Sequence, residues 1–142
     1  MMGGIRGRDT LPERTLRKQL FAAGLRFRLQ RKDLPGRPDI VLAKFGAVIF
    51  VHGCFWHRHP ECRFTTTPKG NARFWEEKFQ KNVARDKRSE LALRELGWKV
   101  AIVWECAVTS IGLIDEDFSR LIAWLTDERL ALEIDGGAIA GR

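Results

Sequence analysis

The chain has 142 residues, of which 44% are hydrophobic and 30% charged, and its formal net charge is +7. This length and composition suit one globular domain, residues 1–142, that buries a core without disulfides. No apolar run reaches the roughly 18 residues of a membrane span, and the N-terminus lacks the apolar core of a signal peptide. We therefore expect a cytoplasmic protein, in which an odd cysteine count favours metal-binding thiolates over disulfides.

The positive charge is concentrated near the N-terminus. Residues 1–38 contain ten Lys and Arg residues against three acidic ones, which accounts for the whole net charge, whereas residues 105–142 are acidic. A concentrated positive field is typical of a protein that binds a phosphate-rich partner. Charge alone leaves open the alternative of a basic protein without such a partner.

The first elements are a flexible arm, a helix and a strand. Residues 1–9 are glycine-rich and basic, and we expect them to form a flexible arm. A helix should begin at Thr10, with Glu13 completing a capping box, and should end at Gly24. Its predicted buried residues are Leu16, Leu20 and Phe21. Alternating apolar and basic residues then predict a strand over residues 25–30.

Two apolar, β-branched runs over residues 39–42 and 47–51 predict a β-hairpin closed by residues 43–46. If the hairpin loop has an even number of residues, Asp39 lies on the same face as His52. A shift of one residue in the pairing would place them on opposite faces.

The second half of the chain alternates loop, helix and strand. We expect an irregular loop over residues 52–67, a helix over 71–96, a strand over 98–104 and a helix from about Asp115, followed by a loose tail over 135–142. The predicted buried residues of the two helices are Trp75, Phe79, Val83, Leu93 and Leu96 in the first, and Phe118, Leu121, Ile122 and Leu125 in the second.

Cysteine and histidine residues gather in the irregular loop. Cys54, His59 and Cys62 lie close together there, and Cys106 follows the last predicted strand. Three thiolates and one imidazole would form the closed tetrahedral shell of a structural zinc site, which would stabilise a loop poor in apolar residues. Three buried free cysteines are the alternative, but the polar surroundings of the first two favour zinc.

A second group of residues has the chemistry of hydrolysis. Asp39 offers oxygen ligands to Mg²⁺. His57 paired with Asp86 can take a proton from an attacking water, and His52 can balance charge at the scissile phosphate. In the alternative, Asp39 caps a turn, Asp86 is solvated and the histidines are packed, and the spacing alone does not decide between these interpretations.

Phe55 and Trp56 are adjacent aromatic residues in the same loop. Exposed aromatic side chains beside basic residues can insert between base steps of DNA, and Met2 on the basic arm could do the same. A small core around the zinc site is an equally good interpretation of the two aromatics.

Several sequence blocks follow one another in a characteristic order. They are IRGRDT at 5–10, LPGRPD at 34–39, HGCFWH at 52–57, the segment from FW at 74–75 to Asp86, and the segment from GW at 97–98 to VWEC at 103–106. These blocks resemble the very short patch repair (Vsr) DNA mismatch endonuclease family. The resemblance spans residues 2–108, HGCFWH is its most specific block, and residues 109–142 contribute nothing to it.

The resemblance implies a fold and an activity. The implied fold is α/β and restriction-endonuclease-like, with a central mixed β-sheet flanked by helices. The implied enzyme uses Mg²⁺ to nick one strand of double-stranded DNA 5′ to the thymine of a T·G mismatch, which arises by deamination of 5-methylcytosine. It would work as a monomer near the nucleoid, with mismatch-repair proteins as candidate partners.

The resemblance also assigns roles to residues of this chain. Asp39 and the main-chain carbonyl of Val51 match the Mg²⁺ ligands. His57 matches the general base and Asp86 its orienting carboxylate, with support from His52 and from Glu13, which already has a capping role. The matching zinc ligands are Cys54, His59, Cys62 and Cys106. The matching DNA contacts are Met2, Phe55, Trp56, Lys78 and Asn82.

Two other functions fit parts of the sequence. A zinc-stabilised DNA-binding module that does not cut would share the basic arm and the aromatic residues, but it has no need for Asp39, His57 and Asp86 together. A related nuclease that cuts paired DNA would keep all of these residues.

Overall fold

The structure, a computed structural model, describes residues 10–62 and 64–136, and its centre is a mixed β-sheet of five strands in the order β1-β2-β3-β4-β5. The strands are β1 (Arg28–Leu29), β2 (Ile40–Leu42), β3 (Ala47–His52), β4 (Lys99–Trp104) and β5 (Ala131–Ile134). Pairing is antiparallel from β1 to β3 and parallel from β3 to β5.

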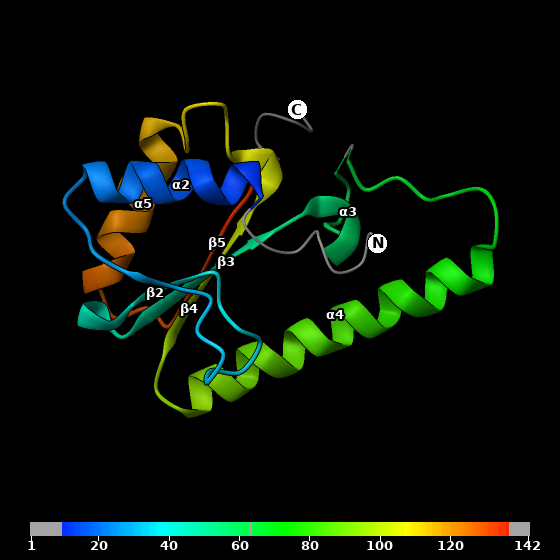
Figure 1. Cartoon of the computed structure of the whole chain (residues 1–142), viewed down its shortest axis with the longest axis horizontal. Coiled ribbons are helices and arrows are strands. Elements are labelled where there is room, and N and C mark those ends of the chain that lie inside the picture. Colours follow the sequence, from blue (N-terminus) through cyan, green and yellow to red (C-terminus); the bar gives the residue numbers. More distant parts are fainter. Residues whose placement is uncertain (1–9, 63, 137–142) are drawn as a thin grey trace.

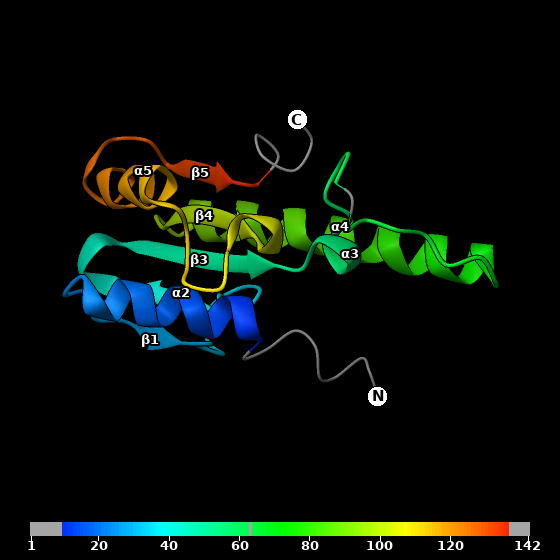
Figure 2. The same ribbon diagram turned by 90° about the horizontal axis from the view of Figure 1, so that it is seen from above.

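Helices cover both faces of the sheet (Figures 1 and 2). The α-helices are α2 (Leu11–Ala22), α3 (Cys54–His57), α4 (Ala72–Glu95) and α5 (Asp115–Thr126), and the 3₁₀ helices are η1 (Ala43–Phe45) and η2 (Glu105–Ala107). Helices α2 and α5 pack on one face and α4 on the other, which confirms a mixed α/β architecture with flanking helices. Among the helices of the described residues, none is long and apolar enough to cross a membrane.

The two faces of the sheet bury alternating strand residues. Toward α2 and α5 lie Ile40, Leu42, Ala47, Ile49, Ala101, Val103, Leu132 and Ile134. Toward α4 lie Val41, Val48, Phe50, Val100, Ile102 and Trp104. Because β3 and β4 are covered on both sides, their sequences are nearly continuous apolar runs, as expected for parallel strands in the centre of a sheet.

Helix α2 begins as predicted, because the Glu13 N–H donates to the Thr10 hydroxyl oxygen at 3.4 Å. Leu16 and Leu20 are fully buried, but the prediction for Phe21 is wrong, since this side chain is 55% exposed. One residue after Leu20, its position is rotated about 100° from the buried stripe. The guanidinium of Arg26 covers the Phe21 ring at 3.9 Å.

The predicted hairpin is confirmed, and of the two registers considered the structure has the one with an even loop. Ile40 pairs with Ile49 and Leu42 with Ala47, so Asp39 falls opposite Phe50. The connection is η1 followed by Gly46, whose φ of 62° lies in the left-handed region that glycine adopts without strain. Asp39 therefore stands just before β2, on the face that packs against α4.

Helix α4 has nearly the predicted bounds, but its buried stripe differs. Phe79 and Leu93 are buried, whereas Leu96 is 63% exposed and Val83 only half-buried. The buried residue in the middle of the helix is instead Asn82. The prediction assumed an apolar partner for the whole helix, but only its C-terminal half packs on the sheet and its N-terminal half extends beyond it (Figure 2).

Other predictions were incomplete. The strand expected over 25–30 is limited to β1, and helix α3 lies in the loop expected to be irregular. Strand β5 was not predicted, because two of its four residues are exposed and the run is short. The loose tail expected over 135–142 is wrong for Asp135 and Gly136, which contact the rest of the protein, and residues 137–142 lie outside the described residues.

Leu93→Ala should lower the free energy of unfolding by about 2 to 5 kcal/mol, because it removes a fully buried side chain that packs α4 on the sheet. The matched control is Leu91→Ala on the same helix, where the side chain is 58% exposed and a change within about 0.5 kcal/mol is expected. Urea unfolding measures both. Equal losses in the two variants would contradict this packing.

Candidate active site and metal centre

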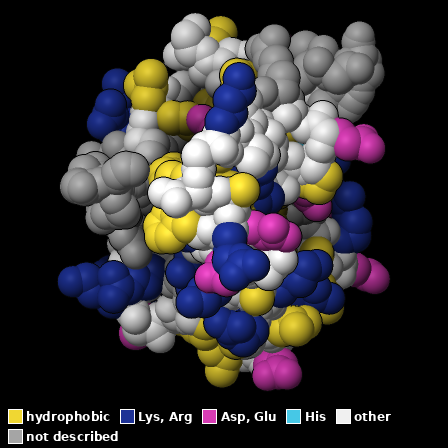
Figure 3. Space-filling model, turned by 90° about the vertical axis from the view of Figure 1, so that its right-hand side faces the viewer, with side chains coloured by type: hydrophobic (Ala, Val, Ile, Leu, Met, Phe, Trp, Pro, Cys, Tyr) yellow, Lys and Arg dark blue, Asp and Glu magenta, His cyan; other side chains and the backbone are white. Residues whose placement is uncertain are grey.

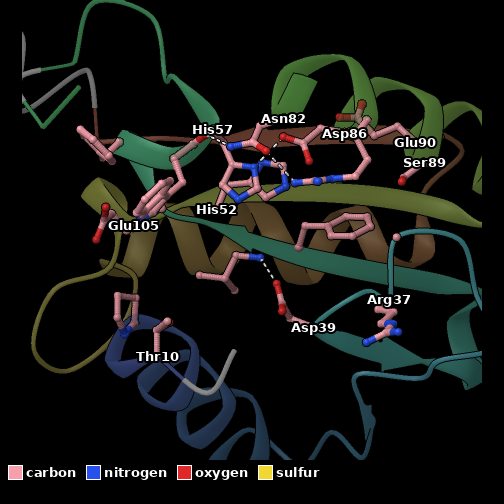
Figure 4. A pocket seen from close by; sticks show the side chains of 18 of the residues that line it. Thr10, Arg37, Asp39, His52, His57, Asn82, Asp86, Ser89, Glu90 and Glu105 are labelled. Atoms are coloured by element: carbon pink, nitrogen blue, oxygen red, sulfur yellow. Dashed lines mark hydrogen bonds and ion pairs between the residues drawn. The ribbon is translucent and has the colours of Figure 1, made fainter. Parts of the chain in front are cut away.

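A cavity of about 900 Å³ opens where the ends of β2 and β3 meet α3 and α4 (Figure 4). It is lined by the predicted catalytic and Mg²⁺-binding residues Asp39, Val51, His52, His57 and Asp86. It is also lined by four of the predicted DNA contacts, Phe55, Trp56, Lys78 and Asn82. The fifth, Met2, lies outside the described residues. Residues from β3, α3, α4 and the loop before β2 thus share one cavity.

Asp39 is held at the edge of the cavity by the backbone. Its side chain is buried, and its Oδ2 accepts the Val51 N–H at 2.7 Å. The preceding loop is pressed against α4 at Gly36, where an added Cβ would stand 2.7 Å from the Cβ of Ser89. Only glycine allows this approach, which places the Asp39 carboxylate across the cavity from α4.

His57 and Asp86 form the shortest polar contact in the cavity. The His57 Nδ1 lies 2.5 Å from Asp86 Oδ2, so the carboxylate accepts the Nδ1 proton. This bond fixes the tautomer and leaves Nε2 as the proton acceptor. The pair joins α3 to α4 and has the geometry of a general base with its orienting carboxylate.

His52 lies against His57 inside the cavity wall. The two rings stack with their centroids 3.9 Å apart and their planes at 3°. Burial, together with the proximity of the His57 ring, lowers the pKa of His52 well below its ordinary value, so the His52 ring is neutral. Its Nδ1 is buried and has no hydrogen-bond partner among the residues that the structure describes.

Ligand atoms of His52, His57 and Asp86 also lie within 4.8 Å of one another, a spacing that could suit a metal ion. However, an imidazole donates its lone pair in the plane of its ring. Two parallel rings cannot direct their lone pairs at one ion without rotating. The arrangement therefore suits proton transfer better than metal binding.

Glu13 is buried in the first turns of α2. Its Oε2 accepts hydrogen bonds from Gln30 Nε2 at 3.0 Å and from Arg17 Nη1 at 3.4 Å. Its neighbours Thr10 and Pro12 line the cavity. The structure thus gives Glu13 contacts of its own beyond the backbone cap at Thr10.

Cys54, His59, Cys62 and Cys106 form a second cluster, whose ligand atoms lie within 4.8 Å of one another. The Cys106 Sγ is 3.5 Å from His59 Nδ1. With zinc bonds of about 2.3 Å to sulfur and 2.0 Å to nitrogen, a tetrahedral ion would separate two such atoms by roughly 3.5 Å. The cluster can therefore hold a tetrahedral metal, and three thiols with an imidazole suit a soft ion.

The parallel pairing of β3 and β4 brings the distant cysteines together. The pairing ends with His52 opposite Trp104, and a cysteine follows each of these residues after one intervening position. The Cys54 N–H donates to the Glu105 Oε1 at 2.8 Å, which fixes the start of α3. Burial raises the pKa values of the Cys54 and Cys106 thiols, so a metal that binds there must displace protons.

Phe55 and Trp56 are half-buried and belong to an aromatic group shared by α3 and α4. Phe55 contacts Phe79 with ring centroids 5.3 Å apart, and Trp56 contacts Trp75 at 6.1 Å. Both also line the cavity. The same rings therefore pack against α4 and remain partly accessible beside the candidate site.

Asn82 has a structural role that its sequence position did not indicate. Its Nδ2 donates to the Trp56 carbonyl at 3.3 Å, and its Oδ1 accepts from Arg85 Nη2 at 2.9 Å. This side chain therefore ties α3 to α4. Lys78, one turn earlier, lines the cavity beside it.

Several residues of the cavity were not predicted from the sequence. Arg37, Arg85 and Glu105 line it, as does Glu90, whose pKa is raised by burial and by the nearby charge of Asp86. Arg85 and Glu90 could have been found, because they lie next to Asp86 or one turn beyond it on the same helix. Arg37 comes from a loop and Glu105 from η2, and only the tertiary structure brings them here.

Basic side chains extend from the cavity along α4. Figure 3 views the end of the molecule at which α4 begins, and Lys and Arg side chains occupy much of its lower half, with hydrophobic side chains among them. Exposed basic residues of this part of the chain include Lys69, Arg73 and Lys81. Positive charge and accessible aromatic rings together are typical of a DNA-binding surface.

Comparisons with known proteins identify the family of this chain. The profile of the family described as DNA mismatch endonuclease Vsr matches residues 1–63. The Escherichia coli protein named DNA mismatch endonuclease Vsr is 46% identical over 136 residues, covering 94% of this chain and 86% of the relative. A type II nicking enzyme of Xanthomonas oryzae is 47% identical, with 86% of this chain and 89% of the relative covered.

A type II nicking enzyme of Neisseria meningitidis serogroup A is 42% identical, and the match covers 87% of this chain and 87% of the relative. Sequence identity of 42% to 47% over most of both chains indicates a shared family and not only a shared fold. The chain therefore belongs to the Vsr family of DNA mismatch endonucleases, and it is an endonuclease.

Proposed function

We propose that this endonuclease uses Mg²⁺ to nick one strand of double-stranded DNA on the 5′ side of the thymine in a T·G mismatch. The observation that carries the proposal is the convergence of Asp39 and the His57–Asp86 pair on one cavity. A DNA-binding module has no use for such an arrangement. A nuclease needs it, because a metal ligand and a base must reach the same phosphate.

The chain itself supplies the proton acceptor. With Nδ1 bonded to Asp86, the His57 Nε2 can take a proton from a water that attacks the phosphorus. Asp86 holds the ring in place and stabilises the positive charge that the ring then carries. The neutral, buried His52 stacks on the base and limits its rotation.

Two metals belong to the proposal. Asp39 and the main-chain carbonyl of Val51 would hold Mg²⁺, which when bound supplies a Lewis acid that stabilises negative charge on the phosphate. The cysteine–histidine cluster would hold a structural Zn²⁺, since four protein ligands leave no open position for water. Glu13 would support the Mg²⁺ centre from α2.

The accessible aromatic rings explain how a mismatch could be recognised. Phe55 and Trp56 at the cavity would insert at the mismatched step, which costs less to unstack than a paired one. Lys78 and Asn82 would contact the DNA near the mismatch, and Met2 on the N-terminal arm would insert beside the aromatic residues.

The fold family, the oligomeric state and the location in the cell also belong to the proposal. We propose that the sheet is the core of a restriction-endonuclease-like fold, and that residues 1–142 work as one domain and as a monomer. The enzyme would act near the nucleoid, in the cytoplasm, and would cooperate with mismatch-repair proteins.

Asp39→Asn should lower the nicking rate on a T·G duplex by about 10³-fold or more, because the Lewis acid that Asp39 would hold is worth several kcal/mol. Binding to the same duplex should persist. A strand-labelled nicking assay and a gel-shift titration measure the two effects. Asp33→Asn, in the same loop but exposed and paired with Arg31, is the control and should nick normally. Undiminished nicking by Asp39→Asn would remove this residue from the metal site.

His57→Ala should lower the single-turnover nicking rate by about 10²- to 10⁴-fold, as loss of a general base does. Asp86→Asn should also slow the reaction, and the double variant should be no slower than His57→Ala, because Asp86 acts through His57. A double variant that shows the product of the two losses would mean that the residues act independently.

Trp56→Ala should weaken binding to a T·G duplex by about 1 to 3 kcal/mol if a base stacks on the ring. Fluorescence anisotropy against T·G and fully paired duplexes measures the loss, which should be greater for the mismatch. Phe21→Ala, an exposed aromatic on α2, is the control. An unchanged affinity for Trp56→Ala would leave this ring with a packing role only.

A further inference from the structure

The end of β5 and the two residues after it, residues 133–136, lie against the cysteine–histidine cluster. Glu133 lies on β5, and its Oε2 accepts the Trp104 Nε1–H at 2.7 Å. The Trp104 ring stacks on His59, with the centroids 4.3 Å apart and the planes at 13°. The C-terminal strand thus fixes the aromatic surface against which one candidate metal ligand lies.

Asp135 contacts that ligand directly. Its Oδ2 accepts the His59 Nε2–H at 3.1 Å, while the other ring nitrogen, Nδ1, lies 3.5 Å from the Cys106 sulfur. The two nitrogens therefore have separate partners, a carboxylate on one side and the cluster on the other. This is the arrangement in which a carboxylate orients a metal-binding histidine and raises its basicity.

Gly136 contacts a second ligand. Its N–H donates to the Cys106 sulfur at 3.3 Å, a bond that favours the charged thiolate over the thiol. A Cβ at this position would stand 2.3 Å from the Cys106 carbonyl oxygen, closer than any side chain allows. The residue must be glycine for the segment to lie this close to the cluster.

An incidental surface ion pair does not account for these contacts. The Asp135 side chain is 41% exposed, but that of His59 is only 5% exposed, so its Nε2 needs a protein partner. The neighbouring residue bonds to another ligand of the same cluster. Two consecutive residues therefore support two different ligands.

We propose that Asp135 and Gly136 are positioning residues of the metal centre, in which Asp135 orients His59 and Gly136 stabilises the Cys106 thiolate. The inference rests on the proposed tetrahedral metal site. It gives a role to residues beyond 108, for which the sequence blocks indicated none, and it makes the end of β5 a part of the metal centre rather than a loose tail.

The experiment titrates metal-free protein with Co²⁺, whose visible absorbance reports a tetrahedral site with thiolate ligands, and then measures competition by Zn²⁺ and a chelator. Wild type should bind one equivalent. Asp135→Asn should show the same spectrum with an affinity about 10- to 100-fold lower. The control Asp115→Asn removes the same charge from an exposed position at the start of α5 and should match wild type.

Gly136→Ala should also bind more weakly, and its control is Gly70→Ala, where an added Cβ meets nothing within 4 Å. If Gly136→Ala does not fold, as circular dichroism would show, Asp135→Asn decides the inference alone. Asp135→Asn with wild-type affinity would overturn it. Cys106→Ser tests the metal site itself and should change the cobalt spectrum. If wild type gives no tetrahedral cobalt spectrum, or if Cys106→Ser gives the wild-type spectrum, the proposed metal centre is refuted, and with it the roles of Asp135 and Gly136.

Discussion

The parallel pairing of β3 with β4 is the constraint on which both sites depend. Its last pair, His52 with Trp104, sets where the two strands leave the sheet. Cys54 follows His52 by two residues, and Cys106 follows Trp104 by two residues. From this point α3 turns toward α4, so that His57 meets Asp86. A shift in this register would separate the cysteines and move the candidate base away from its carboxylate.

The cysteine–histidine cluster and the candidate catalytic cavity both include residues of the short helix α3. Helix α3 has only four residues, too few to be stable by its own hydrogen bonds. It is held by Cys54 at its start, by Asn82 through the Trp56 carbonyl and by Asp86 through His57. A metal bound to the cluster would therefore fix the position of the base without taking part in the chemistry. Trp104 contacts His52 as well as His59, which makes the two regions one packed unit.

Much of this arrangement could be predicted from the sequence, because the signals are local. The hairpin was predicted from its two apolar runs, although its register was left open, and the bounds of α4 followed from Asn71 and Gly97 at its ends. The two groups of metal-binding and acidic residues also stood out by residue type. Strand β5, helix α3 and the contacts of Asp135 could not be predicted, since each depends on segments far apart in the sequence. Asn82 shows the same limit: a polar residue on an amphipathic helix gives no sign that it will be buried by another helix.

The central claim is that one cavity both recognises a mismatch and cuts beside it. The most direct measurement is strand-specific nicking, with Mg²⁺, of a set of duplexes that share their flanking sequence and differ only at one base pair. The account predicts a single cut, 5′ to the thymine, in the T·G duplex, and little or no cutting of the T·A and C·G duplexes. Equal cutting of the paired duplexes, or binding of T·G DNA without any cut, would contradict it.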